Sequence, residues 1–465
     1  MQDYLYSWLN IHKAKPARIE FPKTVEELQS LLRSLKQQQQ PYNFIGSSHS
    51  YNAIQLVDGN VAIVFDGSGL KNIEYDYITH EVSVEAGVTI EELKFFLRPL
   101  GRQLLTSGNF MKQRVIGGVI TGTHGYDHES AIMADSITAA KLLTEDGELI
   151  EITEKEDEET LKYLRVSFGY LGVLVSATLK TKPNEQFRVK QQIFPLSQLQ
   201  EKIDQAAQQP HALTMFPYSD REDPYVGFIS LEKLKRYHPP KQVNLATPLI
   251  SNISWAIIKL FWKIDARVPQ IRPFVQQLIG RLAVNRETEI IITSPDDLDY
   301  LYDYHPMLES ERNPSLARRF LSSNFTAYNV AVFVPKAQLV PLLTFIYKLG
   351  QEFRHQTPPK FFKNSLGVRY VGQSKKCAMA GNYLLESYAV ELFFATQDLE
   401  FAEKVQNRIA EHFPIRPHWG KTILKSYALK HIDPKVIQTF KQKRQEYVGS
   451  GLLKPNLGEL ESELC

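Results

Sequence analysis

Hydrophobic and polar positions in the first 180 residues alternate between a helical and an extended pattern. Apolar residues recur every three or four positions over 25–35 and again over 90–97. A capping box, in which a threonine precedes a glutamate by three positions, stands before each run: Thr24 with Glu27, and Thr89 with Glu92. The pattern therefore predicts one helix behind each of the two boxes.

Short apolar runs in the same part of the chain predict strands. They are continuous or alternate with polar residues, as strands do, and they cover 42–45, 61–65, 82–86 and 173–179. Between the apolar pairs at 142–143 and 149–152, the sequence TEDG at 144–147 carries the Asp-Gly dipeptide of a hairpin turn. A mixed α and β domain that ends near Lys182-Pro183 is therefore expected.

Residues 184 to about 410 predict a second α+β domain. Strand-like and helical runs alternate in it: 290–292, 330–334 and 388–394 are strand-like, and 196–208 and 399–410 are helical. The chain after Pro414 is basic and mostly helical in pattern. The expected organisation is a domain of residues 1–183, a domain of residues 184–410 and a helical segment over 411–465.

Composition and charge exclude several classes of protein. Apolar residues make up 43% and charged residues 23% of the 465 positions, which excludes a disordered or collagen-like chain. The 54 basic and 52 acidic residues leave a formal net charge of +2, without the basic excess of a dedicated nucleic-acid binder. Only Cys377 and Cys465 are cysteines, so a disulfide framework and a cysteine-based metal site are excluded. We expect a cytoplasmic protein without a metal.

The apolar segment Ile250–Ile264 comes nearest to a membrane-spanning run. It contains two lysines and is shorter than the roughly 20 residues that a spanning helix needs. Two interpretations stay open: a buried amphipathic helix, or a helix in the plane of a membrane surface with Trp255 and Trp262 at the interface. Residues 1–15 contain no long apolar stretch of the kind found in signal peptides.

Common catalytic signatures are absent, but two glycine- and hydroxyl-rich loops are present. The motifs GxGxxG, HExxH, CxxC and GxSxG do not occur, and Ile415 stands where a P-loop ending in Gly420-Lys421-Thr422 needs glycine. The loops cover 46–50 and 107–125. Glycine allows a ligand to approach the backbone, and exposed N–H groups and hydroxyls bind anions. The loops therefore suit a pyrophosphate, with tight turns between strands as the alternative.

Four motifs occur in a characteristic order: GSSHS at 46–50, GGVITGTHG at 117–125, SFGYLGVLVSATL at 167–179 and HWGK at 418–421. This order resembles the vanillyl-alcohol oxidase superfamily, and within it the sugar-lactone and alditol oxidases. The resemblance implies the α+β, two-domain FAD-binding fold of that superfamily. An α+β cap domain would cover the substrate, and the C-terminal segment 411–465 would return to the FAD site.

The resemblance also implies a covalent cofactor. In the family, the histidine of the first motif is bonded to the 8α-methyl group of FAD, and His49 holds that position here. The attacking imidazole must be neutral. A loop histidine that caps a turn is the alternative for His49, and a structural hydrogen bond is the alternative for His124. The remaining residues assigned to FAD are Gly46, Ser47, Ser48, Ser50, Ser107, Gly108, Gly117, Gly118, Thr121, Gly122, Thr123, His124, Gly125 and Val173.

The implied reaction transfers hydride from a carbinol C–H to flavin N5. Lys421 and Arg369 are candidate catalytic cations that stabilise the reduced flavin and a developing alkoxide, with a surface position as the alternative for each. Gly367 stands where the family has the glutamate of Glu-x-Arg, and residues 373–376 replace an acidic run. Glu391 lies on an apolar strand where alditol oxidases have histidine. It is a candidate to restore the missing acid or to accept the hydroxyl proton.

We expect an FAD-dependent oxidoreductase that acts on the CH–OH group of a polyol, sugar or aldonolactone, with O2 as acceptor and H2O2 as product. One alternative is a dehydrogenase that reduces a quinone or cytochrome, in peripheral contact with a membrane through residues 250–264. A non-catalytic flavin or sugar binder is the other, supported by the lost Glu-x-Arg motif. The near-zero net charge suits a neutral substrate better than an anionic polymer.

Overall fold

The computed structural model describes most of the chain. The residues described are 4–67, 69–108, 110–125, 131–206, 209–215, 217, 222–235, 268–271, 274, 289–292, 327–363, 366–395, 398–423, 427–458 and 460–464. The predicted segment Ile250–Ile264, with both alternatives raised for it, lies outside these residues.

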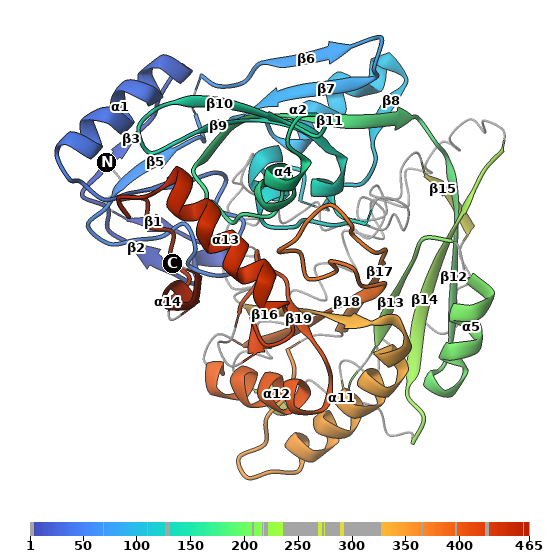
Figure 1. Cartoon of the computed structure of the whole chain (residues 1–465). Coiled ribbons are helices and arrows are strands. Elements are labelled where there is room, and N and C mark those ends of the chain that lie inside the picture. The colour runs from blue at the N-terminus through green and yellow to red at the C-terminus, as the bar shows by residue number, and fades with distance from the viewer. Residues whose placement is uncertain are drawn as a thin grey trace, which may run out of the picture.

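Three sheets and the helices around them form the N-terminal part, and the smallest of the three is the pair β1–β2 (Figure 1). Strands β3, β5 and β4 form a parallel sheet, and β10, β9, β11, β7 and β6 form an antiparallel one, with β8 paired to β11. The elements, with 3-10 helices labelled η, are β1 (Leu5–Tyr6), η1 (Trp8–Asn10), β2 (Lys13–Ala14), β3 (Arg18–Glu20), α1 (Val25–Gln37), β4 (Tyr42–Ile45), β5 (Val61–Val64), β6 (Ile73–Asp76), β7 (Glu81–Glu85), α2 (Ile90–Leu97), η2 (Arg98–Leu100), β8 (Arg102–Leu104), α3 (Val115–Ile120), η3 (Met133–Ser136), β9 (Ile137–Leu143), β10 (Leu149–Thr153), α4 (Glu158–Leu164) and β11 (Val173–Pro183).

Both predicted capping boxes begin helices, but only one is complete. At α2, the Thr89 side chain accepts a hydrogen bond from the backbone of Glu92, and the Glu92 carboxylate accepts one from the backbone of Thr89. At α1, Thr24 caps the helix in the same way, whereas the Glu27 carboxylate accepts from the backbone N–H of Lys23. The predicted hairpin at 144–147 is also confirmed, since it joins β9 to β10.

A single eight-stranded antiparallel sheet dominates the rest of the chain. Its strand order is β15-β12-β14-β13-β17-β18-β16-β19, and α5, α11 and α12 cover one face (Figure 1). The elements are β12 (Phe187–Pro195), η4 (Leu196–Gln198), α5 (Leu199–Ala206), β13 (His211–Met215), β14 (Tyr225–Lys233), η5 (Pro269–Ile271), β15 (Glu289–Ile292), β16 (Ala327–Pro335), η7 (Lys336–Gln338), α11 (Leu339–Arg354), β17 (Leu366–Val371), β18 (Ser387–Ala395), α12 (Leu399–His412), β19 (Arg416–Pro417), α13 (Pro434–Tyr447) and α14 (Leu460–Leu464).

The central strands of this sheet are buried on both faces, and alternate residues point to different cores. Val330, Val332 and Val334 of β16 pack against the helices, whereas Phe333 packs into the core of the N-terminal part. In β18, Val390 and Ala389 divide between the two cores in the same way. Successive side chains in a strand point to opposite faces. The odd-numbered residues of these strands therefore face the N-terminal part.

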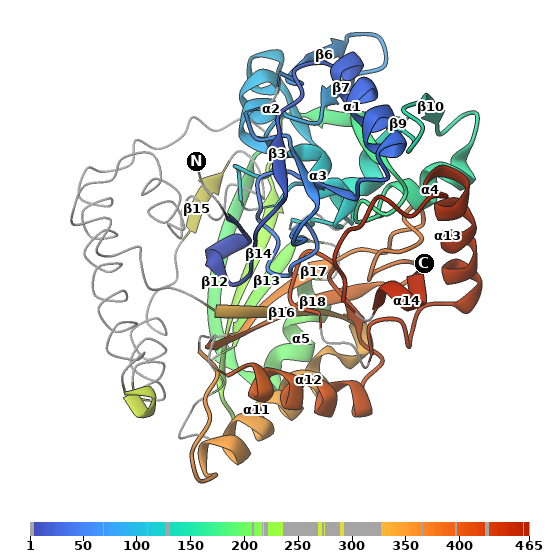
Figure 2. The same cartoon turned by 90° about the vertical axis from the view of Figure 1, so that its left-hand side faces the viewer.

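The C-terminal segment returns to the N-terminal part after β19. Helix α13 lies beside α4 in both views (Figures 1 and 2), and Phe440 of α13 belongs to the core of the N-terminal part. The backbone N–H of Tyr42 donates to the carbonyl of Leu452 over 2.9 Å. The segment after Pro414 thus contains α13 and α14 and, besides them, a strand and long stretches of irregular backbone. The division of the chain at 183 and 410 stays a prediction.

Candidate functional site

The glycine-rich loop at 117–125 is a short helix followed by a tight turn. Gly122 has φ +74°, a left-handed conformation that favours glycine. The Thr121 hydroxyl donates to the carbonyl of Gly117 over 2.9 Å. Gly108 approaches the turn so closely that a Cβ there would lie 2.5 Å from Cγ2 of Thr123. The two halves of the loop region 107–125 are therefore packed together, at a point where only a glycine fits.

Three of the recognised motifs meet at Gly420. Its carbonyl accepts a hydrogen bond of 2.9 Å from the backbone of Tyr51, directly after the first motif. A Cβ on Gly420 would lie 3.5 Å from the side chain of Thr121, in the second motif. The amide of Asn52 donates to the carbonyls of Trp419 and Lys421 over 2.6 and 3.0 Å. Motifs separated by up to about 370 residues therefore form one continuous surface.

His49 lies in the loop after β4, held by a left-handed backbone at Ser48 with φ +54°. Both ring nitrogens of His49 are buried, and neither has a hydrogen-bond partner among the described residues. Burial lowers the pKa of the imidazole to about 4, against the opposing effect of the Ser47 backbone and with a smaller contribution from the Arg114 guanidinium. The ring is therefore neutral at ordinary pH, as the attacking histidine of a covalent flavin link must be.

Other buried polar atoms around these loops also lack a partner among the described residues. They are Ser47 Oγ, Thr106 Oγ1 and Gln113 Oε1. A buried polar group without a hydrogen bond costs about 1–3 kcal/mol. Three such groups near these loops are what the binding site of a polar ligand would contain before the ligand binds. The loops fit FAD in this respect, because the cofactor carries acceptors and donors along its length.

Polar side chains on the face of the large sheet turned towards the N-terminal part form a charged cluster. Three odd-numbered residues lie on this face: Asn329 of β16, Arg369 of β17 and Glu391 of β18. The Asn329 amide donates to Oε2 of Glu391 over 2.8 Å, and an Arg369 guanidinium nitrogen lies 3.9 Å from Oε1 of Glu391. The alternation of the strands therefore explains why these three polar residues, far apart in sequence, share one site.

Lys421 reaches the same cluster from the segment after β19. Its Nζ lies 3.3 Å from Oε2 of Glu391 and 4.7 Å from the centre of the Tyr51 ring. Burial alone would raise the pKa of Glu391, but the charges of Lys421 and Arg369 lower it well below its usual range. Burial lowers the pKa of Lys421, against the opposing effect of Glu391. The cluster contains a carboxylate between two cations, and neither Lys421 nor Arg369 lies in the open surface position considered as its alternative.

Two histidines adjoin this cluster. The rings of His124 and His418 are 5.3 Å apart, and Phe333 packs against both. Burial lowers the pKa of each, to about 3 for His124. The Gly420 N–H donates to Nδ1 of His418 over 3.1 Å, so neutral His418 carries its proton on Nε2. His124 lies 3.4 Å, through Nδ1, from the carbonyl of Gly125, which is the structural hydrogen bond considered for it.

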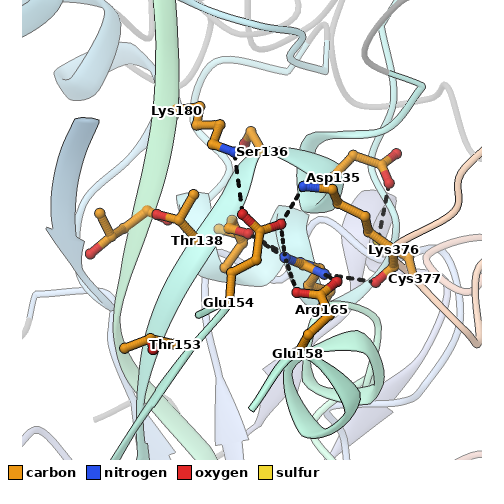
Figure 3. Close-up of polar contacts among 12 residues, drawn as sticks. Asp135, Ser136, Thr138, Thr153, Glu154, Glu158, Arg165, Lys180, Lys376 and Cys377 are labelled. Atoms are coloured by element: carbon orange, nitrogen blue, oxygen red, sulfur yellow. Dashed lines mark hydrogen bonds and ion pairs between the residues drawn. The ribbon is translucent and has the colours of Figure 1, made fainter. Parts of the chain in front are cut away.

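The loop that replaces the acidic run, between β17 and β18, is attached to the N-terminal part (Figure 3). The Ser374 hydroxyl donates to Asp135 over 2.6 Å, and Lys376 forms an ion pair with Glu154. The buried Arg165 guanidinium donates to the carbonyl of Lys376 over 3.1 Å. Because Arg369 and Glu391 lie on the two strands that this loop joins, these contacts fix their position over the glycine loops.

Four residues of this site were not among those predicted: Tyr51, Asn329, His418 and Trp8, whose ring stacks on that of His49. A signal existed for two of them. Asn329 is an isolated polar residue in the apolar strand β16, as Glu391 is in β18, and His418 precedes the tryptophan of the fourth motif. Val173, which was predicted, begins β11 opposite Leu143, in the core of the N-terminal part.

A family model described as an FAD binding domain matches residues 16–153. This part of the chain is therefore similar in sequence to an FAD-binding domain. It contains the loops at 46–50 and 107–125, with the unpartnered polar atoms of Ser47, His49 and Gln113. Among the described residues, no group of three or more His, Cys, Asp or Glu side chains could hold a metal ion.

Several curated proteins that are similar to the chain are named as oxidases or dehydrogenases of sugar lactones. The chain is 31% identical over 199 residues to L-gulonolactone oxidase of Bos taurus, covering 43% of this chain and 44% of that protein. It is 25% identical over 206 residues to D-arabinono-1,4-lactone oxidase of Saccharomyces cerevisiae, covering 44% and 39%. It is 28% identical over 220 residues to L-gulono-1,4-lactone dehydrogenase of Mycobacterium tuberculosis, covering 46% and 50%. The chain thus spans half or less of the length of these relatives.

The whole chain is similar in fold to cholesterol oxidase from Brevibacterium sterolicum. The TM-score is 0.71 at 15% identity, and the match covers 100% of this chain and 97% of that structure. Together with the FAD-binding domain, this similarity confirms the predicted fold class, an α+β, two-domain FAD-binding fold of the vanillyl-alcohol oxidase type.

Proposed function

We propose that this protein is an FAD-dependent oxidoreductase that oxidises a CH–OH group of a polyol, sugar or aldonolactone. The observation that carries the proposal is the cluster of Lys421, Glu391 and Arg369 on the sheet face over the FAD-binding loops, with Lys421 Nζ 3.3 Å from Glu391 Oε2. The names of the related lactone oxidases support this substrate class.

When bound, FAD would supply a two-electron acceptor for the hydride of the substrate C–H. The loops that hold the cofactor are 46–50 and 107–125, in which unpartnered Ser47 Oγ and Gln113 Oε1 are available as hydrogen-bonding groups. His49 provides a neutral imidazole for a covalent link to the 8α-methyl group. Val173 and the remaining predicted residues complete the cofactor contacts in this proposal.

The cations stabilise the charge that develops on oxygen during oxidation. Lys421 and Arg369 face the same point of the cluster, where preorganised positive charge lowers the free energy of an alkoxide-like transition state. Glu391 accepts the hydroxyl proton. Its pKa is low, but a weak base is sufficient here because an alcohol becomes strongly acidic as its hydride leaves. Asn329 holds the carboxylate in place through its 2.8 Å hydrogen bond.

A panel of neutral polyols, sugars and aldonolactones, mixed anaerobically with the purified protein, tests the proposal. Bleaching of the flavin absorbance by at least one compound is the expected result, and a Lys421→Met variant should bleach far more slowly with that compound. Flavin that binds but is bleached by none of the panel would instead support the non-catalytic binder, the alternative based on Gly367.

The electron acceptor is O2 in this proposal, with H2O2 as product. The dehydrogenase alternative keeps support, because one related protein is named a dehydrogenase. Peroxide formation and dye reduction under air separate the two. Peroxide equimolar with oxidised substrate favours the oxidase, whereas dye reduction without peroxide favours electron delivery to a quinone or cytochrome.

The cytoplasmic location and the membrane contact also remain proposals. No helix among the described residues is long and apolar enough to cross a membrane, and residues 250–264 are not among them. Flotation of the full chain with anionic vesicles, compared with a variant in which Trp255 and Trp262 are both replaced by serine, tests the peripheral contact. Equal flotation of the two proteins would remove this segment from consideration.

A further inference from the structure

The N-terminal residues form a small hairpin that lies against the loop of His49. Strands β1 and β2 pair antiparallel, with Leu5 opposite Ala14, and η1 forms the turn between them. The backbone N–H of Trp8 donates to the carbonyl of Ser50 over 3.2 Å. The hairpin is therefore anchored to the first FAD-binding motif by its backbone, independently of any side chain.

The indole of Trp8 covers the imidazole of His49. The two ring centres are 4.5 Å apart and the planes differ by 23°, which is a stacked arrangement. Phe110 approaches both rings, with centre distances of 5.3 Å to Trp8 and 6.1 Å to His49. The stack restricts rotation of the imidazole about its bond to Cβ, and it does so without using a ring nitrogen, since both nitrogens of His49 have no partner.

We propose that Trp8 is a positioning residue for covalent attachment of flavin at His49. The inference rests on the proposed covalent link. Stacking fixes the plane of the imidazole while leaving both nitrogens available, so one nitrogen can face the 8α-methyl group in a single orientation. A hydrogen bond to a ring nitrogen would also orient the ring, but it would occupy one of the two nitrogens.

The attachment step is balanced when O2 takes up the electrons. A C–N bond forms between the imidazole and the 8α carbon, one C–H bond of that methyl group breaks, and the imidazole N–H proton is released. The two electrons pass through the flavin to O2, which leaves as H2O2 with the two protons. The imidazole must be neutral to attack, and shielding by Trp8 contributes to the burial that keeps it so.

The charged groups that face His49 are Arg114 and Asp66, which form an ion pair with each other. Arg114 disfavours the imidazolium and Asp66 favours it, and the shift from burial is larger than either. Loss of the indole should therefore let the pKa of His49 rise from about 4 towards its ordinary value of 6.5. At pH 5 a complete return to 6.5 would reduce the neutral fraction of the imidazole by about 30-fold, so a partial return reduces it by less.

The experiment measures flavin attachment rather than turnover. Full-length protein produced in riboflavin-starved cells is mixed with FAD at pH 5 to 8, and flavin retained by the acid-precipitated polypeptide is followed over time. In Trp8→Ala, attachment should slow about tenfold at pH 8, and its rate should fall further as the pH approaches 5. Trp8→Phe should recover most of the rate, and Tyr4→Ala, which alters an exposed ring of the same hairpin, should match the wild type.

A second pair of variants separates positioning from loss of cofactor binding. In a His49→Ala background, which cannot form the link, Trp8→Ala should bind FAD non-covalently with an affinity within about threefold of the background, as flavin fluorescence quenching measures it. The inference is overturned if Trp8→Ala attaches flavin with the wild-type rate and pH profile, or if FAD affinity falls as much as the attachment rate. A wild-type chain that binds FAD and releases all of it on precipitation would overturn both this inference and the link at His49, while leaving the proposed oxidation intact.

Discussion

Gly367 and Glu391 lie directly opposite each other on β17 and β18, and a Cβ at position 367 would begin 3.8 Å from the Cβ of Glu391. The family's glutamate position and the carboxylate that this chain carries are thus neighbours across one strand pair. A carboxylate on either strand can reach the same cations, Lys421 and Arg369. The carboxylate that is absent at position 367 is thus supplied by Glu391 on the neighbouring strand.

This relationship predicts a rescue. Glu391→Gln should slow anaerobic flavin reduction by about 100-fold or more, because the hydroxyl proton loses its acceptor. Adding Gly367→Glu to that variant should recover part of the rate, since among the described residues only the Glu391 Cβ lies within 4 Å of the point where the new side chain would begin. Gly367→Glu alone should slow the reaction, because two adjacent carboxylates repel. If the double variant binds FAD but is as slow as Glu391→Gln, a carboxylate at position 367 cannot replace the one at position 391.

Lys421 should contribute to the rate through its charge. Lys421→Met is expected to slow flavin reduction by about 100-fold, the usual effect of removing one preorganised donor from an oxyanion site. Lys421→Arg should retain more activity than the methionine variant. Lys443→Met, which removes a lysine paired with Glu446 on the surface of α13, is the matched control and should leave stopped-flow traces unchanged.

The buried histidines should make the fold sensitive to acid. Burial lowers the pKa of both His124 and His418 below the ordinary value of 6.5, so the unfolded chain binds more protons than the folded one between pH 6.5 and about 3. The free energy of unfolding should therefore fall as the pH falls through this window. Replacing either by glutamine should flatten the slope by up to about 1.4 kcal/mol per pH unit, as urea denaturation at several pH values measures it. Replacement of exposed His355 is the control, and an equal flattening there would contradict the assignment.

The contact between Gly108 and Thr123 gives a prediction about packing. Gly108→Ala should destabilise the FAD-binding domain by about 1–3 kcal/mol, because its Cβ would lie 2.5 Å from Cγ2 of Thr123. Thr123→Ser removes that methyl group and keeps the hydroxyl, so the double variant should recover most of the loss. Thermal denaturation and FAD titration measure the two effects. A double variant no more stable than Gly108→Ala would show that the strain lies elsewhere.

Two residues of the polar network around Arg165 should differ in how much they contribute to stability (Figure 3). The Arg165 side chain is fully buried and donates to Glu154, Glu158 and two carbonyls, so Arg165→Met should cost about 3 kcal/mol in unfolding free energy. Lys376 is partly exposed, and Lys376→Met should cost less than about 1 kcal/mol. Urea denaturation measures the unfolding free energy of each variant, and an equal loss in Arg165→Met and Lys376→Met would contradict this prediction.

The sequence contained enough information to predict several of the elements and to name candidate residues for the site. Capping boxes and alternating apolar residues located α1, α2 and β7, because those signals are local. Glu391 could be predicted for the same reason, since a carboxylate in an apolar strand is costly without a partner. The two cations were assigned through the resemblance, and the identity of their partner could not be predicted, because it depends on strand order.

The residues that were missed depend on contacts between distant segments. Trp8 lies in a hairpin with no motif of its own, and its stack on His49 follows from the way that hairpin lies against the first loop. Tyr51 was placed beside Lys421 by a backbone hydrogen bond to Gly420, which no sequence pattern encodes. Asn329 carried a local signal, as a polar residue in the apolar strand β16, but its contact with Glu391 depends on β16 and β18 being neighbours.

The return of the C-terminal segment has a consequence for synthesis on the ribosome. The amide of Asn456 donates to the carbonyl of Leu56, 400 residues earlier, and the backbone of Tyr42 pairs with Leu452. The segment 42–56, which contains the His49 loop, therefore lacks these partners on a growing chain until residues 452–456 have been translated, about 400 residues later. Until then this edge of the N-terminal part is exposed to chaperones and proteases.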